Sequence, residues 1–337
     1  MRLVVTIPAQ NEAPTIGQVV REIPRDIPGV DGVDVVVVDD SSSDGTADIA
    51  RAAGATVVPI HGRPGLGPVW RLGMERAVRS GADLIVNLDG DGQFNSADVA
   101  EIIQPLLRGE CDFVTCTRFA GDGPEGRMPL VKRLGNRAVT WMTNRVCGTN
   151  LTDVSCGFRA YNREAAYRLA QFGRWTYTEE CIVYLVSRGL RIQEMPFRVL
   201  GERRHGQSRV AGNVFYFASH LMHILVRAVR DGRPLKFFGI LSFVLGLPGV
   251  LLLLFIGGWY VATGALSPFR QFMTLGGVSV TLGLVVGVLA LLADMVSRHR
   301  LIHEELLYLA RCRAYGQAGP VTTALAEGAE LAAMFED

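Results

Sequence analysis

The stretch Leu84–Gln93, LIVNLDGDGQ, decides the fold of the first half of the chain and supplies its first candidate site residues. Its opening residues are almost all apolar, and it ends in Asp89 and Asp91. This pattern is typical of a buried strand that runs out into a tight turn. Because residues i and i+2 of an extended chain point to the same side, both acids can face one ion. Their hard oxygens suit Mg²⁺ or Mn²⁺, Gly90 and Gly92 leave room for a bulky anion, and the alternative is an ordinary solvated turn.

Apolar strands alternate with helical segments on either side of this stretch. Strands are predicted at Arg2–Pro8, Val33–Val38, Ala55–Ile60 and Phe113–Thr117, and helices at Thr15–Ile23, 46–53 and Val69–Ser80. Polar residues follow two strands directly: Gln10, Asn11 and Glu12 after the first, and Asp39 and Asp40 after the second. This alternation predicts a parallel sheet with a ligand crevice at its carboxyl edge. The glycines at 65 and 67 lack the third glycine of a dinucleotide-binding fingerprint, so a Rossmann cofactor domain is not favoured.

Two long uncharged stretches distinguish the second half of the chain. The 337 residues carry a net charge of +1, which does not indicate a nucleic-acid partner. Phe237–Phe269 and Gln271–Ala293 contain no charged residue, and each exceeds the roughly 20 residues that cross a bilayer as a helix. We therefore predict a membrane region at 235–297, with transmembrane helices at about 237–262 and 272–296, rather than a buried soluble hairpin.

The charges that flank these spans predict their orientation. Basic residues precede the spans at 227, 230, 233 and 236 and follow them at 298 and 300, whereas the turn between them carries only Arg270. Under the positive-inside rule, both ends of the hairpin lie in the cytoplasm, including a tail at 298–337. The N-terminal apolar run is too short for a signal peptide. The six cysteines show no metal-ligand spacing, which fits reduced thiols in a cytoplasmic domain.

Two basic amphipathic helices are predicted to lie at the membrane interface. In the first, 129–147, apolar residues recur at helical spacing with Lys132, Arg133, Arg137 and Arg145 between them. The second, 209–230, lies just before the first span. Helices of this kind bind flat on anionic bilayers, although an ordinary surface helix remains the alternative for the first one.

Five segments together resemble a known family. TIPAQNE at 6–12, VVVVDDSSSDGT at 35–46, RPGLGPVW at 63–70 and LDGDGQ at 88–93 resemble, in this order, the nucleotide-sugar domain of family 2 glycosyltransferases with the GT-A fold. Within that family they are most similar to the polyprenyl-phosphate hexosyltransferases, the dolichol-phosphate mannose synthase group. DVSCGFR at 153–159 resembles a further block of the family, D-x-x-S-G-F-R, with Cys156 where Ser or Thr is common. The resemblance implies a GT-A catalytic domain at 1–208 with a mixed, mostly parallel sheet, followed by amphipathic interface helices and the transmembrane hairpin.

The resemblance also implies roles for the donor-side residues. The base and ribose pocket would be lined by Pro8, Gln10, Glu12, Asp39 and Asp40, with Gln10 standing where an aromatic residue is usual. Either Asp39 or Asp40 would contact the base. Asp89, Asp91 and Gln93 would hold Mg²⁺ or Mn²⁺ on the donor diphosphate, with Gly90 beside them. The ion would then stabilise the leaving nucleoside diphosphate.

Basic residues are the candidates for binding an acceptor phosphate. GERRHGQSR at 201–209 resembles the R-x-x-G-x-S-K loop of the family, with Arg209 replacing the usual lysine. The candidates are Arg203, which is also counted as catalytic, with Ser208, Arg209, Lys132, Arg133 and Arg118. A basic juxtamembrane anchor is the competing interpretation of the loop, and Arg118 is either a phosphate ligand or a surface charge.

Two further features bear on the reaction. Gln171–Trp175 spells Q-x-x-R-W, a signature of processive polysaccharide synthases, but it precedes the acidic pair Glu179 and Glu180 instead of following it. The motif is therefore interpreted as a coincidence. A sugar hydroxyl acceptor would need Glu179 or Glu180 as a general base, whereas a phosphate acceptor is already nucleophilic at pH 7.

The sequence predicts a multi-pass membrane enzyme whose catalytic domain faces the cytoplasm. It would transfer mannose or glucose from a GDP- or UDP-linked donor to polyprenyl phosphate, either dolichyl or undecaprenyl phosphate, and the resemblance implies inversion. Homo-oligomerisation is left open. One alternative is a glycosyltransferase that acts on a lipid or sugar hydroxyl. The other is a non-catalytic, nucleotide-binding membrane accessory protein.

Overall fold

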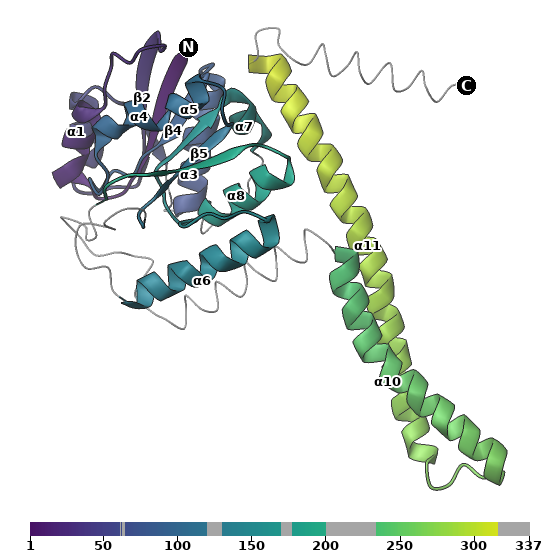
Figure 1. Ribbon diagram of the computed structural model, residues 1–337. Helices are drawn as coiled ribbons and strands as arrows, with labels where there is room; N and C mark the ends of the chain where they lie inside the picture. The colour runs from purple at the N-terminus through teal and green to yellow at the C-terminus, as the bar shows by residue number, and fades with distance from the viewer. Residues whose placement is uncertain (61, 63–64, 120–129, 170–176, 200–233, 316–337) are drawn as a thin grey trace, which may run out of the picture. The chain divides into compact units, whose positions relative to one another are not determined.

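The computed structural model describes residues 1–60, 62, 65–119, 130–169, 177–199 and 234–315 (Figure 1). These residues form two compact units. One contains the described residues up to 199 together with 305–315, and the other contains residues 234–304. The predicted fold class, an α/β sheet followed by long apolar helices, is therefore confirmed, whereas the predicted domain bounds stay predictions.

The first unit is an α/β domain. Its strands are β1 (Arg2–Ala9), β2 (Gly32–Asp40), β3 (Thr56–Ile60), β4 (Leu84–Asn87), β5 (Phe113–Thr117), β6 (Arg159–Asn162) and β7 (Ile192–Pro196). Its helices are α1 (Ala13–Glu22), α2 (Thr46–Ala52), α3 (Leu66–Arg79), η1 (Ser96–Asp98), α4 (Val99–Ile102), α5 (Gln104–Leu107), α6 (Leu130–Cys147), α7 (Arg163–Arg168) and α8 (Thr178–Ser187). The predicted strands and helices up to α6 are all present, within a few residues of their expected bounds.

One antiparallel strand interrupts an otherwise parallel sheet. The strand order is β3-β2-β1-β4-β6-β5-β7, and β6 runs antiparallel to both β4 and β5. An antiparallel strand begins at the edge where its parallel neighbours end, and Asn87 at the end of β4 pairs with Arg159 at the start of β6. The chain that enters β6 therefore lies beside the turn that leaves β4.

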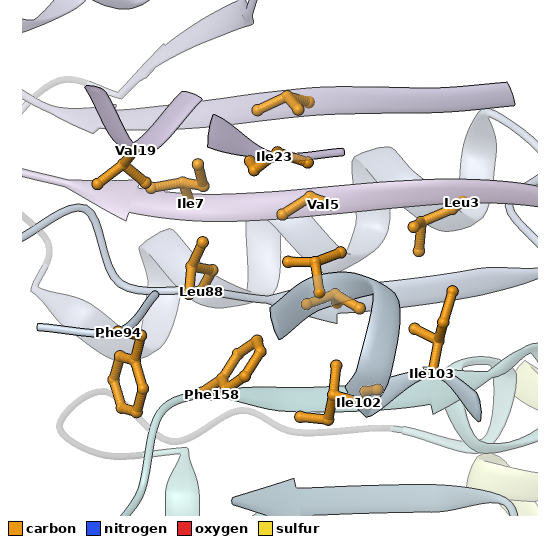
Figure 2. Close-up of a cluster of buried hydrophobic side chains, with 14 of the residues drawn as sticks. Leu3, Val5, Ile7, Val19, Ile23, Leu88, Phe94, Ile102, Ile103 and Phe158 are labelled. Carbon is orange, nitrogen blue, oxygen red and sulfur yellow. The ribbon is translucent and has the colours of Figure 1, made fainter. Parts of the chain in front are cut away.

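The core is built from strands that are buried on both faces, as expected for the centre of a parallel sheet. On one face, Leu3, Val5 and Ile7 of β1 are fully buried and pack with side chains of α1, α4 and the entrance to β6 (Figure 2). On the other face, Gly73 lets α3 approach closely, because a Cβ there would lie 3.3 Å from Thr6 and from Val38. The sheet is thereby held rigid on both sides.

The second unit contains most of two long apolar helices. They are α10 (Pro234–Thr263) and α11 (Arg270–Tyr315), and each is long and apolar enough to cross a membrane by length and composition. Only 11% and 17% of their most apolar stretches are buried, unlike the core helix of a soluble protein. The helix α10 matches the predicted first span, whereas α11 continues well past residue 296.

Small residues form the seam between α10 and α11. The Ser242 hydroxyl donates to the Gly283 carbonyl at 2.7 Å, and the Ser279 hydroxyl donates to the Leu245 carbonyl at 2.5 Å. A Cβ on Gly283 would lie 2.6 Å from the Cα of Gly246. Close backbone approach of this kind is how helices pack within a bilayer, where no hydrophobic effect drives them together.

The last turns of α11 belong to the first unit and pack on α3 and α7. The Tyr308 hydroxyl donates to Glu164 at 2.7 Å. Arg311 donates to the carbonyls of Tyr167 and Leu169 at 2.9 and 2.6 Å and to Glu75 at 3.0 Å. The segment 305–315 is thus tied to the sheet domain, whereas the sequence prediction placed it in a tail.

Candidate active site

The predicted donor-side residues converge on the carboxyl edge of the parallel strands. Because β2, β1 and β4 are neighbours in the sheet, the residues that follow them lie side by side. Pro8 and Gln10 come from the end of β1, Asp39 and Asp40 from the end of β2, and Asp89 and Asp91 from the turn after β4. The sequence argument from strand ends therefore places these six residues correctly relative to the sheet.

The loops after β1 and β2 are locked together by hydrogen bonds. Gln10 Nε2 donates to the Asp40 carbonyl at 2.9 Å, and the Glu12 amide donates to Thr46 Oγ1 at 2.9 Å. Asn11 both accepts from the Ser43 amide and donates its own amide to Ser42 Oγ, each at 2.9 Å. Asn11 has a left-handed backbone with φ of 54°, which asparagine tolerates better than most residues. Gln10 thus connects the two loops.

Asp39 presents an unsatisfied oxygen in this region. The residue is 6% exposed, and its Oδ2 accepts a hydrogen bond from the Ser42 amide at 3.3 Å. Its Oδ1 is buried and has no hydrogen-bond partner among the described residues. Buried carboxylate oxygens are normally satisfied, so this atom is suited to accept a hydrogen bond from a ligand. Asp40 is equally buried but faces the opposite side of β2, because side chains alternate along a strand.

The turn after β4 is anchored to the N-terminal end of α1. Thr15 Oγ1 donates to the Gly90 carbonyl at 2.8 Å, and Asp91 Oδ1 accepts from the Gln93 amide at 3.0 Å. A Cβ on Gly90 would lie 3.3 Å from side chains of Ile7 and Ile16. The space beside Gly90 is therefore filled by the core. Gly90 therefore allows the turn to pack closely on Ile7 and Ile16, whereas the sequence analysis expected it to leave room for a bound anion.

The two acids fit a divalent ion that takes its remaining ligands from a substrate. Asp91 is 3% exposed and Asp89 is half-buried, and both supply hard oxygen ligands. Among the described residues, no group of three or more His, Cys, Asp or Glu could hold a metal by itself. Mg²⁺ and similar ions are commonly held by one or two carboxylates plus substrate phosphates. Asp89, Asp91 and Gln93 would therefore hold the metal on a diphosphate.

Arg118 is engaged by a buried acid. Its Nε and Nη2 donate to the two carboxylate oxygens of Asp153 at 2.6 and 3.0 Å, and Asp153 is fully buried. Burial alone would lower the pKa of Arg118, but the hydrogen bonds and charge of Asp153 raise it above its usual value. This pairing gives Arg118 a structural partner that the sequence did not indicate, and Asp153 orients its guanidinium.

Arg159 fastens the 153–159 block from within. Its side chain is fully buried, and its three nitrogens donate to the carbonyls of Val154, Cys156 and Thr178 at 2.7, 2.8 and 2.6 Å. A guanidinium presents its donors in a fixed fork, so it holds the three carbonyls in one geometry. The block is therefore a rigid wall beside the acidic turn.

Sequence reasoning missed a buried polar cluster around Asn87 and Tyr177, at the end of β4. The buried Asn87 donates from Nδ2 to the Gly157 carbonyl and to the Tyr177 hydroxyl, both at 2.8 Å. The Tyr177 ring stacks on Trp70 at a centroid distance of 4.6 Å. Burial raises the pKa of Tyr177 well above its usual value, and the nearby charge of Asp89 adds to the effect. The available signal was an asparagine in an otherwise apolar strand.

The acidic pair lies at the start of α8. Glu179 is 7% exposed and accepts hydrogen bonds from the hydroxyls of Ser155 and Thr178, at 3.0 and 2.6 Å, one on each oxygen. Glu180 is half-buried. Glu179 is therefore integrated into the wall formed by the 153–159 block.

Several predicted acceptor-side features lie outside the described residues. They are Arg203, Ser208 and Arg209, the side chain of Lys132, the predicted helix 209–230 and the whole Q-x-x-R-W motif. Arg133 is described and is exposed on α6. Of the acceptor candidates, only Arg118 and Arg133 can thus be placed in the structure.

Comparison with known proteins identifies the domain. The family model described as glycosyl transferase family 2 matches residues 4–170. The chain is 27% identical to a UDP-N-acetylglucosamine–dolichyl-phosphate N-acetylglucosaminyltransferase of Methanococcus voltae, covering 58% of this chain and 84% of the relative. It is 26% identical to an undecaprenyl-phosphate mannosyltransferase of Micrococcus luteus, covering 64% and 89%.

A solved structure shows the same fold. Glucosyl-3-phosphoglycerate synthase from Mycobacterium tuberculosis, in complex with Mn²⁺, UDP-glucose and phosphoglyceric acid, superposes with a TM-score of 0.50 at 25% identity. The match covers 68% of this chain and 78% of that one. The strand order, the strand-end acids and these comparisons agree: the chain is a glycosyltransferase with the GT-A fold and belongs to glycosyl transferase family 2.

Proposed function

We propose that this glycosyltransferase moves a hexose, mannose or glucose, from a nucleoside diphosphate donor to the phosphate of a polyprenol. One observation carries the proposal: a single chain holds the strand-end acids of a GT-A domain and two helices suited to cross a bilayer. The named relatives, which act on dolichyl and undecaprenyl phosphate, support a lipid phosphate as the acceptor. The Mn²⁺ and UDP-glucose in the solved relative support a metal-dependent reaction with a nucleotide sugar.

The donor would bind across the carboxyl edge of the sheet. Asp39 Oδ1 would accept a hydrogen bond from the base or ribose, and the wall of residues 153–159 would bound the sugar. Asp89, Asp91 and Gln93 would hold the divalent ion, which when bound would neutralise the negative charge that develops on the leaving nucleoside diphosphate. An acceptor phosphate oxygen then bonds to the anomeric carbon as the bond to the diphosphate breaks, and a single in-line displacement inverts that carbon.

The environment of Glu179 favours a phosphate acceptor over a hydroxyl acceptor. A sugar hydroxyl needs a base that can take its proton, whereas a phosphate monoester is largely dianionic at pH 7. Both oxygens of Glu179 already accept hydrogen bonds from Ser155 and Thr178, so this residue serves the structure of the wall. Glu180 is left as the base for the alternative reaction on a lipid or sugar hydroxyl.

We expect purified protein in detergent to produce lipid-soluble counts from a radiolabelled GDP- or UDP-linked sugar and a short polyprenyl phosphate. Arg203→Ala should abolish most of this transfer, because it removes a cation proposed to bind the acceptor phosphate. Glu180→Gln should leave most of the transfer intact, because no base is required. The reverse pattern would favour the hydroxyl acceptor. Calorimetry that detects donor binding, combined with no transfer to any acceptor, would instead favour the non-catalytic, nucleotide-binding accessory protein.

We further propose that α6 rests on a membrane surface and that the catalytic domain faces the cytoplasm. Leu134 and Trp141 are each 67% exposed on α6, with Arg133, Arg137 and Arg145 exposed beside them. Exposed large apolar side chains flanked by arginines are typical of helices that insert shallowly into anionic bilayers. The domain bounds 1–208 and 209–230 remain predictions, as does the cytoplasmic orientation.

Trp141→Glu should raise the KM for polyprenyl phosphate in anionic liposomes about tenfold, because a buried apolar contact with the lipid is replaced by a repelled charge. The KM for the nucleotide sugar should stay unchanged. Ala52→Glu is the matched control, since it adds the same charge at an exposed position of α2. Initial rates over a series of acceptor densities give both constants. Equal acceptor KM values for the two variants would contradict the placement of α6.

A further inference from the structure

Gly157 lies directly against the Asp89 carboxylate. A Cβ built on Gly157 would lie 2.6 Å from Asp89 Oδ2, 3.0 Å from Oδ1 and 3.1 Å from Cγ. Real Cβ atoms essentially never come within 3.0 Å of a heavy atom from elsewhere in the chain, so the glycine is required for this approach. No positive φ is involved, so the backbone at Gly157 would accept another residue. The absent side chain therefore matters for Asp89 and not for the local backbone.

The backbone at Gly157 is held in place from three directions. Its carbonyl accepts a hydrogen bond from Asn87 Nδ2 at 2.8 Å, and Asn87 lies two residues before Asp89. On one side, the Cys156 carbonyl is held by Arg159 at 2.8 Å. On the other side, the Phe158 ring is fully buried between Phe94 and Phe197, with centroid distances of 5.4 Å to each. Gly157 therefore cannot move away from the carboxylate without disturbing this packing.

Buried side chains also fix the end of β4, which lies two residues before Asp89. Asn87 is fully buried at the end of β4 and also donates to the Tyr177 hydroxyl, and the Tyr177 ring is fixed by its stack on Trp70. The charge of Asp89 contributes to the raised pKa of Tyr177, which places the two groups within electrostatic reach. The end of β4 is thus fixed by Tyr177 and by the Gly157 carbonyl. Gly157 also limits, on one side, the space that the Asp89 carboxylate can occupy.

We propose that Gly157 is a positioning residue: its bare backbone sets the orientation in which Asp89 presents its carboxylate to the divalent ion. This inference rests on the proposed metal-dependent function. It gives the 153–159 block a role that its sequence does not reveal, which is to position a metal ligand in the turn after β4. A methyl group at position 157 would push the Asp89 carboxylate and leave the fold largely intact, because Asp89 is a short side chain with a movable end.

The test is direct binding of Mn²⁺ to the full-length protein in detergent, measured from the signal of free Mn²⁺ in electron paramagnetic resonance. Titrations are done with GDP and, separately, with UDP. Gly157→Ala should weaken Mn²⁺ binding at least tenfold in the presence of the nucleotide that supports binding to the wild type. Gly32→Ala is the matched control, because a Cβ there meets nothing within 4 Å and its φ is not positive. It should bind Mn²⁺ like the wild type.

A double variant shows whether Gly157 acts through Asp89. Asp89→Ala alone should weaken Mn²⁺ binding strongly, and adding Gly157→Ala should weaken it no further, because the displaced group is already gone. If Gly157→Ala also lowers the melting temperature, Asp89→Ala should restore it by removing the clash. Unchanged Mn²⁺ binding in Gly157→Ala, or a melting temperature that Asp89→Ala does not restore, would overturn the proposal.

The same titrations distinguish failure of this inference from failure of the proposed function. If the wild type binds no Mn²⁺ with either nucleotide, or if Asp89→Ala binds it as tightly as the wild type does, the metal site itself is refuted. If Asp89→Ala abolishes binding while Gly157→Ala matches Gly32→Ala, the metal site stands and only the role of Gly157 is refuted.

Discussion

Asp91→Asn is expected to lower the rate of sugar transfer by about a thousandfold. Asparagine keeps the oxygen that accepts the Gln93 amide at 3.0 Å, so the turn should remain folded. What is lost is one negative charge on a carboxylate that is 3% exposed and proposed to hold the metal. A metal ion contributes several kcal/mol to stabilising the charge of a transition state, and about 4 kcal/mol corresponds to a thousandfold in rate.

Initial rates of lipid-soluble product formation, at saturating donor and Mn²⁺, measure this loss. Asp48→Asn is the control, because Asp48 is an exposed acid on α2 whose partner is Arg51. It should retain the wild-type rate, since surface ion pairs of this kind contribute little. If Asp91→Asn turned over within a few-fold of wild type, the acidic turn would not be the metal site.

Arg159→Met is expected to cause the largest loss of stability, at least about 3 kcal/mol. Methionine approximates the length and volume of the aliphatic stem but donates no hydrogen bond. The carbonyls of Val154, Cys156 and Thr178 would each lose their donor inside a fully buried site, and each buried unsatisfied group costs about 1–3 kcal/mol. A loss of this size lowers the melting temperature by roughly 6–12 °C in a domain of this length.

Native cysteines provide the readout for this experiment. Cys111, Cys116, Cys156 and Cys181 are free and buried, so a thiol-reactive dye reports their exposure as the domain unfolds. Arg51→Met removes an exposed arginine and serves as the control, whose midpoint should match that of the wild type. A midpoint for Arg159→Met equal to the control would show that the three carbonyls find other donors.

The parallel part of the fold could be predicted because its signals are local. The strands β1 to β5 are short apolar runs, and the rule that ligands bind at the carboxyl ends of parallel strands brings their terminal acids together. The strands β6 and β7 carry no such signal. The strand β6, RAYN, is four residues long and begins with a charged residue, and only the tertiary structure buries Arg159 among carbonyl groups. The predicted second span ends at about residue 296 because the hydropathy falls there, whereas α11 continues to Tyr315. Ion pairs within the helix, such as Arg300 with Glu304, stabilise this polar continuation.

The contacts that shape the site depend on register and could not be read from the chain. Gly157 meets Asp89 because β6 pairs antiparallel with β4, and this pairing joins residues about seventy positions apart. Gly90 shows the converse. A glycine between two acids suggests room for a ligand, yet its neighbours are Ile7 and Ile16, which arrive from β1 and α1. The acids Asp89 and Asp91 could therefore be identified from the sequence, whereas the residues that surround them follow from the strand pairing of the sheet.

The interlocked loops after β1 and β2 have a consequence for substrate choice. Hydrogen bonds join Asn11 to Ser42 and Ser43 and join Glu12 to Thr46, so the part of the pocket proposed for the base is shaped by contacts within the protein itself. A preformed surface loses little conformational freedom when it is occupied. It also has little capacity to remodel itself around an ill-fitting molecule. Discrimination between purine and pyrimidine nucleotides should therefore come from a rigid template, which rejects the wrong base by misfit rather than by adjustment.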